Sequence, residues 1–298
     1  MMENWLDVFN DSDLNDTLKR DGIVKFNIPD FNAESYSQLL KDIVDGYPHE
    51  FESTFYGSVS IADLDIKRKV DTEIASLLTS KLTSSFVNHR LLTYFFLVKG
   101  KGDNSVLRLH QDWNIIDERK YRAYNLWIPL SDSSVKNGTL FAIKGSHNFP
   151  LNIRGAAIPP KYASQFETAK KYLTPFNVKT GEALLFDSSL LHYSPPNHSK
   201  NSRTAIINNV IPADAETMCF HGKEKDGQLE VNRYDVPDDL FIHYNDFNNQ
   251  KDSPNPVGVH QETIDYGNTT DVSSLELKSL LKAHQIKKKS LFLKSGLS

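Results

Sequence analysis

The chain is organised around one stretch, Leu107-Arg108-Leu109-His110-Gln111-Asp112-Trp113. On an extended segment, an imidazole and a carboxylate two residues apart point to the same side, so both can bind one metal ion. A second imidazole lies in the later stretch Ser188-Ser189-Leu190-Leu191-His192-Tyr193-Ser194. Two histidines and one carboxylate on one face of an octahedral iron leave three positions open for a bidentate cosubstrate and O2. We therefore predict a non-heme Fe(II) centre held by His110, Asp112 and His192.

A second His-x-acid triplet, His260-Gln261-Glu262, competes with this interpretation. In a chain with 10 histidines and many acidic residues, such a triplet is expected about once by chance. The rival follows a Pro- and Gly-containing loop signal, and only His284 lies downstream, within a Lys-rich tail. His110 instead lies on a strand-like run, and its partner His192 is followed by Arg203 at the start of an apolar strand. The context favours the first triplet.

Composition describes an ordinary globular chain of 298 residues, with 39% hydrophobic and 24% charged residues. The single cysteine, Cys219, rules out an internal disulfide framework and fits a reducing compartment, so we expect a cytoplasmic protein. A net charge of −4 with neither sign dominating argues against a nucleic-acid partner. No run approaches the length of a membrane span, and the acidic N-terminus does not resemble a secretion signal. Nothing in the sequence indicates an oligomeric state.

Helical patterns dominate the first part of the chain, and strand patterns dominate from about residue 90. We expect helices at 12–20, 33–44 and 74–82. We expect strands at 22–26, 89–99, 106–110, 124–130, 139–143, 183–186 and 203–211. Many short strands separated by turn signals predict a sandwich or barrel, with the helices covering one face of a sheet.

The order and spacing of these motifs resemble the phytanoyl-CoA dioxygenase family of Fe(II)/2-oxoglutarate oxygenases, over roughly residues 15 to 220. The segments that carry the resemblance are His110-Gln111-Asp112, Trp127, Asn137-Gly138-Thr139-Leu140 with Gly145-Ser146-His147, Gly181-Glu182, His192-Tyr193-Ser194, Asn197 and Arg203. The resemblance implies a mainly β fold with flanking helices, a double-stranded β-helix (jelly roll, cupin-like). We expect this domain to span 1–220, with a C-terminal extension, 221–298, that packs on or near the barrel.

The resemblance also implies a cosubstrate site for 2-oxoglutarate. Arg203 would bind its distal carboxylate, Ser194 would add a hydrogen bond, and Thr93 and Trp127 are further candidates for the same pocket. A buried dicarboxylate needs a fixed positive partner, and a guanidinium gives a bidentate one. Period-2 alternation places Arg203 on an inward, apolar face of its strand.

The implied reaction uses Fe(II), O2 and 2-oxoglutarate to hydroxylate a small-molecule substrate, with decarboxylation of 2-oxoglutarate to succinate. Related halogenases carry a small residue in place of the ligating carboxylate, so Asp112 favours hydroxylation over halogenation. Two alternatives stay open. One is a cupin-like binding or structural protein without turnover, and the other is desaturation or cyclisation at the same iron site.

Two segments fit a role in substrate binding. Residues 148–177 are longer than a hairpin loop and fit a lid or a wall of the site. Residues 114–124 carry Arg119, Lys120 and Arg122, which fit either a site for an anionic group or a solvated face. The tail from Ser273 has a helical pattern followed by Lys287-Lys288-Lys289, which predicts a peripheral helix.

Overall fold

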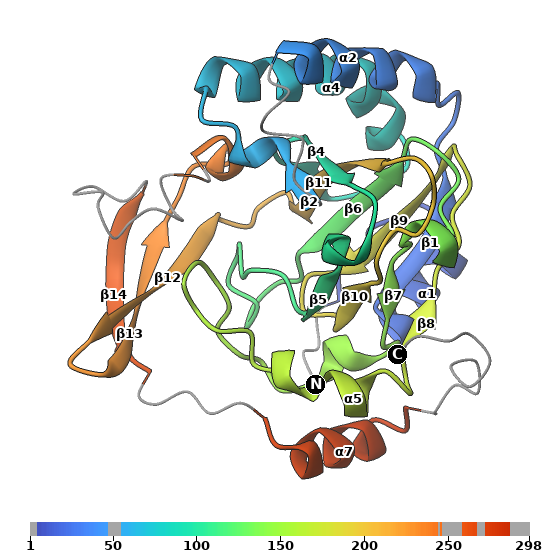
Figure 1. Cartoon of the computed structure of the whole chain (residues 1–298). Helices are drawn as coiled ribbons and strands as arrows, with labels where there is room; N and C mark the ends of the chain where they lie inside the picture. The colour runs from blue at the N-terminus through green and yellow to red at the C-terminus, as the bar shows by residue number, and fades with distance from the viewer. Residues whose placement is uncertain (1–4, 47–54, 244, 246–257, 267–271, 287–298) are drawn as a thin grey trace.

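The computed structural model describes residues 5–46, 55–243, 245, 258–266 and 272–286 (Figure 1). The α-helices are α1 (Ser12–Asp21), α2 (Ala33–Gly46), α4 (Leu64–Thr83), α5 (Phe166–Ala169) and α7 (Ser274–Ala283). The strands are β1 (Ile23–Asn27), β2 (Phe55–Gly57), β3 (His89–Leu91), β4 (Phe95–Lys99), β5 (Leu107–His110), β6 (Tyr124–Pro129), β7 (Phe141–Ala142), β8 (Thr174–Pro175), β9 (Glu182–Asp187), β10 (His192–Ser194), β11 (Arg203–Pro212), β12 (Met218–Lys225), β13 (Gln228–Asp235) and β14 (Val259–Asp265).

Two antiparallel sheets face each other and form the barrel. The larger sheet has the strand order β1-β9-β6-β11-β4-β2, with β3 also pairing with β11, and the smaller has the order β5-β10-β7-β8. Apolar side chains from both sheets fill the space between them, among them Trp127 and Ile207 from the larger sheet and Leu140 and Ala142 near or on the smaller one. The predicted double-stranded β-helix is confirmed.

Helices α2 and α4 cover the outer face of the larger sheet, as predicted (Figure 1). Helix α4 begins where the Asp63 carboxylate accepts hydrogen bonds from two backbone N–H groups of the first turn. Its buried apolar side chains recur every four residues, so one stripe of the helix faces the sheet. These side chains are Val70, Ile74, Leu78 and Leu82. The helix begins ten residues before the predicted start at 74, because its first turns are rich in charged residues that conceal the apolar stripe.

We expect Leu78→Ala to lower the free energy of unfolding by about 2–5 kcal/mol, because it leaves a cavity in this core. Leu78 is fully buried, whereas its neighbour Leu77 is 40% exposed. Leu77→Ala is therefore the matched control, with an expected loss below about 1 kcal/mol. Urea denaturation monitored by circular dichroism measures both values, and equal losses in the two variants would contradict the packing described here.

The strand predicted at 89–99 is interrupted, and this is a correction. β3 ends at Leu91 and β4 begins at Phe95. Between them, the Asn208 carboxamide accepts from the backbone N–H of Leu92 at 3.1 Å and donates to its carbonyl at 2.7 Å. The backbone N–H of Tyr94 donates to the Asp71 carboxylate at 2.7 Å. The backbone N–H of Leu92 also donates to the Asn209 carbonyl at 2.9 Å. Side chains distant in the sequence thus supply much of the backbone hydrogen bonding of this segment, which a local sequence pattern does not reveal.

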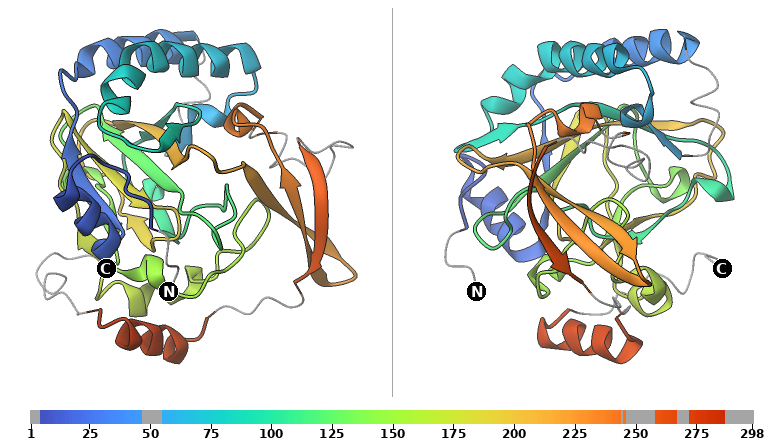
Figure 2. Two further views of the ribbon diagram at one scale, coloured as in Figure 1. Left: turned by 180° about the vertical axis from the view of Figure 1, so that it is seen from behind. Right: turned by 90° about the vertical axis from the view of Figure 1, so that its left-hand side faces the viewer.

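The C-terminal part adds a three-stranded sheet of order β12-β13-β14 beside the barrel, visible in the right-hand view of Figure 2. The domain boundary predicted at 220 falls inside β12, and the division of the chain there stays a prediction. Helix α7 packs beside α5, with Leu277 and Leu281 in the apolar cluster that contains Tyr162. Lys287-Lys288-Lys289 lies outside the described residues. None of the described helices combines the length and the hydropathy that a membrane crossing requires.

Candidate metal centre and its cavity

Pairing of β5 with β10 brings the two predicted histidine ligands together. His110 lies directly opposite His192 in this antiparallel pair, and the ring centroids are 4.1 Å apart. The Asp112 carboxylate lies against both rings, with Oδ1 3.4 Å from Nε2 of His110 and Oδ2 3.5 Å from Nε2 of His192. One ligand atom from each of the three residues lies within 4.8 Å of the other two. In the described part of the chain, this is where His, Cys, Asp or Glu side chains come close enough together to hold a metal ion. The three predicted metal ligands therefore converge.

Backbone carbonyls set the orientation of both imidazoles. Nδ1 of His110 lies 2.7 Å from the carbonyl oxygen of Arg108, and Nδ1 of His192 lies 2.9 Å from that of Leu190. Because a carbonyl only accepts, each Nδ1 carries the proton and each Nε2 keeps its lone pair. Metal-binding histidines are held in this way. Burial, and next the neighbouring His110, lowers the pKa of His192 to about 4, so this ring is neutral as metal binding requires.

The Asp112 carboxylate is ionised and fixed by amide donors. Burial alone would raise its pKa, but His192, His110 and Arg154 outweigh burial and hold the pKa below its usual value. Nδ2 of Asn125 donates to Oδ2 of Asp112 at 2.8 Å. The backbone N–H of Asp112 donates to the Ser188 carbonyl at 2.9 Å. The convergence of these three side chains thus fits a divalent metal ion.

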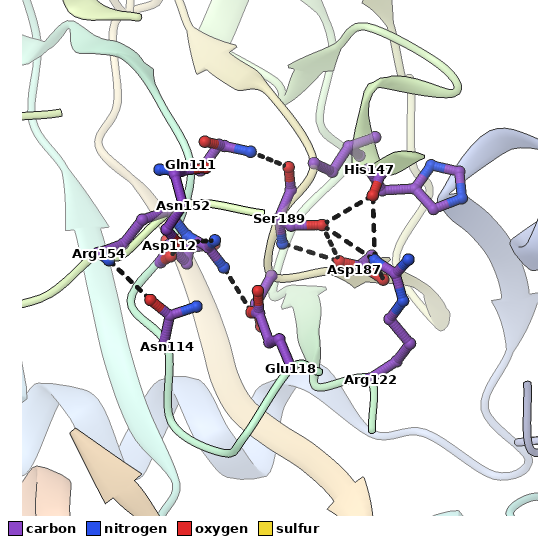
Figure 3. A network of polar contacts seen from close by, with 12 residues as sticks. Gln111, Asp112, Asn114, Glu118, Arg122, His147, Asn152, Arg154, Asp187 and Ser189 are labelled. Carbon is purple, nitrogen blue, oxygen red and sulfur yellow. Dashed lines mark hydrogen bonds and ion pairs between the residues drawn. The ribbon is translucent and has the colours of Figure 1, made fainter. Parts of the chain in front are cut away.

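Arg154 supports the loop that carries the carboxylate ligand, a role that was not predicted for it (Figure 3). Its Nε donates to the backbone carbonyl of Asp112 at 2.6 Å, and its Nη2 donates to Glu118 at 2.5 Å. Its backbone N–H donates to Oδ1 of Asn114 at 2.6 Å. Arg154 belongs to the segment 148–177, which was predicted to form a lid or wall, and residues 158–162 of that segment line the cavity beside the metal ligands.

The basic segment 114–124 does not offer free cations to this cavity. Nε of Arg119 donates to Asp117 at 2.8 Å, and Arg122 lies 3.4 Å from the Asp187 carboxylate. Neither arginine lines the cavity. A site for an anionic group in this segment is therefore not supported, because nearby carboxylates compensate both charges.

A cavity of about 350 Å³ extends from the metal ligands into the barrel. Arg203, at the start of β11, lines it and is 3% exposed. Its guanidinium makes no hydrogen bond or ion pair with any residue that the structure describes, and it lies 4.9 Å above the centre of the Trp127 ring system. Burial lowers the pKa of Arg203 to about 9, so it keeps its charge at neutral pH. A buried cation without a counter-ion is costly, so this site requires an anion.

The other predicted pocket residues divide into two groups. Trp127 and Ser194 line the cavity, but the Ser194 hydroxyl donates to the carbonyl of Gly138 at 2.7 Å, so it faces a ligand only as an acceptor. Thr93 does not line the cavity, and its hydroxyl lies 3.5 Å from the Asp238 carbonyl. The prediction for Thr93 does not agree with this position. The break between β3 and β4 removes Thr93 from the regular alternation of the strand.

The competing triplet His260-Gln261-Glu262 does not converge with His284. His260 lies on β14, with its Nε2 3.0 Å from the hydroxyl of Thr263. Glu262 lies 3.8 Å from Arg233, and the ring of His284 packs against Phe149 in another part of the fold. These three residues form no metal site.

Lys99 lies opposite Arg203 across the β4–β11 pair and is fully buried. Its Nζ donates to the Pro195 carbonyl at 2.9 Å, and also to the carbonyls of Ser105 and Ser194. Burial, and next the charge of Arg203, lowers the pKa of Lys99 to about 7. This lysine ties the chain after β10 to the strand that precedes the metal-binding segment.

We expect the stability of the protein to depend on pH through Lys99. Above a folded-state pKa of about 7, the folded lysine has lost a proton that the unfolded lysine keeps until about pH 10.4. The free energy of unfolding therefore rises between these values, by at most about 1.4 kcal/mol per pH unit. Lys99→Met should lack this rise, and Lys101→Met, at an exposed position, should keep it. Urea denaturation at pH 7.5 and pH 9 measures the difference, and parallel behaviour of Lys99→Met and wild type would refute the expectation.

Several curated proteins are similar to this chain in sequence. It is 27% identical over 135 residues to the phytanoyl-CoA dioxygenase domain-containing protein 1 homolog of Dictyostelium discoideum, covering 43% of this chain and 48% of that protein. It is 28% identical over 169 residues to the phytanoyl-CoA dioxygenase of Arabidopsis thaliana, covering 55% and 57%. The chain thus spans about half the length of the curated relatives that it matches.

Two solved structures are similar to this chain in fold. The non-heme alpha ketoglutarate dependent carbocyclase SnoK matches with a TM-score of 0.53 and 14% identity, over 70% of this chain and 86% of that chain. The epimerase SnoN in complex with Fe3+, alpha ketoglutarate and nogalamycin RO matches with a TM-score of 0.51 and 16% identity, over 84% and 94%. At these identities the similarity shows the shared fold.

The family assignment rests on a match to a family model rather than on any single relative. The model of the family described as phytanoyl-CoA dioxygenase (PhyH) matches residues 45–205, a segment that contains β2 to β10, all three converging ligands and Arg203. Because this match covers more than half of the chain, the protein belongs to the phytanoyl-CoA dioxygenase family.

Proposed function

We propose that this protein is an Fe(II)- and 2-oxoglutarate-dependent oxygenase that hydroxylates a small molecule and converts 2-oxoglutarate to succinate and CO2. One observation carries the proposal. Three convergent ligand atoms and a buried guanidinium without a counter-ion among the described residues share one cavity. Membership of the phytanoyl-CoA dioxygenase family supports the same activity. SnoN, which shares the fold, is described with iron and alpha ketoglutarate bound.

The charges in the cavity match this cosubstrate. His110, Asp112 and His192 would hold the metal on one face, and Arg203 would bind the distal carboxylate of 2-oxoglutarate. Fe(II) and Arg203 would thus oppose the negative charges of Asp112 and of the two carboxylates. Stacking on Trp127 restrains the plane of the guanidinium, so a bidentate contact costs little further ordering. When bound, iron would supply the redox chemistry with O2, and the residues of the chain supply geometry and charge.

Much of the remaining wall is apolar, although Lys161 and Arg154 also line the cavity. Phe95, Ile115, Ile158 and Phe241 line the cavity together with the metal ligands. Side chains of this kind displace water and so strengthen the electrostatic contacts at the metal face. The carboxylate of Asp112 occupies the third ligand position, which favours hydroxylation over halogenation.

The test is 2-oxoglutarate binding and turnover by protein loaded with Fe(II) under anaerobic conditions. Calorimetry measures binding of 2-oxoglutarate with and without the metal, and succinate is then measured after exposure to O2, alone and with pools of small molecules. Iron-dependent succinate that one pool increases would support the proposal. Incorporation of one atom from labelled O2 into the product distinguishes hydroxylation from desaturation or cyclisation. Folded protein that binds neither iron nor 2-oxoglutarate would refute the proposal and leave a cupin-like binding protein.

A further inference from the structure

Three buried polar atoms of the cavity lining have no hydrogen-bond partner among the described residues. They are Nε of Arg203, Oε1 of Gln111 and Oδ1 of Asn209. The proposed function accounts for the arginine, which would meet a carboxylate of 2-oxoglutarate. It leaves two carboxamide oxygens unexplained. Both are acceptors, and each unpaired buried acceptor carries a desolvation cost.

Asn209 lies on the floor of the cavity, on the same face of β11 as Arg203 and Ile207. It is 4% exposed and pairs across the sheet with Asn125 of β6. Six residues of strand separate Asn209 from Arg203, a distance of about 20 Å at 3.3 Å per residue. The two side chains therefore lie at opposite ends of the cavity floor, and Asn209 is remote from the expected position of the distal carboxylate.

A chain of hydrogen bonds from the metal-binding carboxylate fixes the orientation of Asn209. The Asp112 carboxylate only accepts, so the group of Asn125 that lies 2.8 Å from it is the amide nitrogen. The oxygen of Asn125 then faces Asn209, and it accepts from Nδ2 of Asn209 at 2.6 Å. A flipped Asn209 would place two acceptors against each other. Oδ1 of Asn209, a residue of the cavity lining, is consequently the atom of this carboxamide that has no partner among the described residues.

We propose that Oδ1 of Asn209 accepts a hydrogen bond from the substrate, and that the substrate is a small, largely apolar molecule with an alcohol or N–H group beside the reacting carbon. This inference rests on the proposed function, because it assigns Asn209 to the substrate side of the metal. Asn209 reaches Asp112 through one intervening amide, so a donor held there lies close to the metal face. Oε1 of Gln111 offers a second acceptor to a molecule with two donors.

A site of this kind discriminates strongly against analogues without the donor. An apolar analogue would leave the Asn209 oxygen buried and unpaired, whereas the true substrate satisfies it. The apolar walls give no comparable discrimination, because a change of one methylene alters apolar binding only modestly. Asn209 would therefore be a specificity-determining residue.

The experiment uses the full chain loaded with Zn(II) in place of iron and saturated with 2-oxoglutarate, so that no turnover occurs. The probes are 1-indanol and 1-methoxyindane, which share an apolar body and differ in the donor. Ligand-observed NMR titrations give the Kd of each probe for wild type, Asn209→Leu and Phe241→Leu. Asn209→Ala serves as the second variant if the leucine variant does not fold. The comparison is the ratio of the two Kd values, so the extra methyl group of the ether cancels between variants.

We expect wild type to bind the alcohol about ten-fold more tightly than the ether, and Asn209→Leu to reduce this ratio to about one. Phe241→Leu should weaken both probes and keep the ratio. A ratio near one in wild type, as expected if water always occupies Oδ1, would overturn the inference. So would a ratio that Asn209→Leu leaves unchanged, or binding of neither probe by wild type. The 2-oxoglutarate affinity of the same samples separates the two claims, because its absence in wild type would count against the proposed function alone.

Discussion

Asp112→Ala is expected to lower the affinity for Fe(II) by more than about 100-fold and to abolish succinate formation from 2-oxoglutarate. Loss of groups that merely orient a metal ligand typically costs about 10–100-fold in affinity, so loss of the ligand itself should exceed this range. The substitution removes the anionic ligand and leaves the two imidazoles as the remaining protein ligands. It also leaves Nδ2 of Asn125 without the carboxylate that it contacts. Both effects weaken the same site.

Metal titration monitored by the d–d absorption of Co(II) measures the affinity, and liquid chromatography measures succinate. Asp103→Ala is the control, because the side chain of Asp103 is 91% exposed and lies outside the cavity lining. It should retain both properties. Wild-type metal affinity in Asp112→Ala would show that these three residues do not hold the metal.

Arg203→Leu should raise the KM for 2-oxoglutarate by about 100-fold or more while metal binding is retained. Truncation of one member of a buried, hydrogen-bonded charge pair costs about 2–5 kcal/mol. Arg203→Lys should fall between wild type and Arg203→Leu, because lysine keeps the charge and loses the bidentate geometry. Steady-state succinate kinetics over a range of 2-oxoglutarate concentrations give the three values.

Arg203→Leu should also change the stability of the ligand-free protein, and here we expect a gain rather than a loss. Without 2-oxoglutarate, Arg203 is a buried charge with no counter-ion among the described residues. Its replacement by leucine should therefore raise the free energy of unfolding of the ligand-free protein, whereas a residue that only supports the fold would lower it. A KM for 2-oxoglutarate equal to that of wild type would refute the assignment of Arg203.

Local pattern was sufficient to predict the parts of the site that lie on a strand or directly after one. His110 and Asp112 are two residues apart, and the inward face of β11 follows from alternation, so both features can be read over short distances. Many short strands between turns predicted a sandwich or barrel, the family resemblance implied the jelly roll, and the structure confirms that fold. The role of each residue in binding iron or 2-oxoglutarate stays a prediction.

The supporting contacts could not be predicted, because their partners lie far apart in the sequence. Arg154 is 42 residues from the Asp112 carbonyl that it contacts, and Asn209 is 84 residues from Asn125. Nothing in a single sequence marks an ordinary Asn or Arg for such a role. Thr93 shows the converse: the family resemblance made it a candidate for the pocket, but it lies in the break between β3 and β4, where side chains from distant segments bind the backbone, and it does not line the cavity.

One side of the cavity is formed by strand β11 and another by a loop. This arrangement makes the protein suitable for redesign. β11, which carries Arg203 and Asn209, is paired on both sides by β4 and β6, so its backbone resists displacement. Residues 158–161 also face the cavity but belong to no helix or strand. Loops tolerate replacement better than paired strands. A combinatorial library confined to these four positions would change which molecules enter, and leave intact the machinery that would consume 2-oxoglutarate.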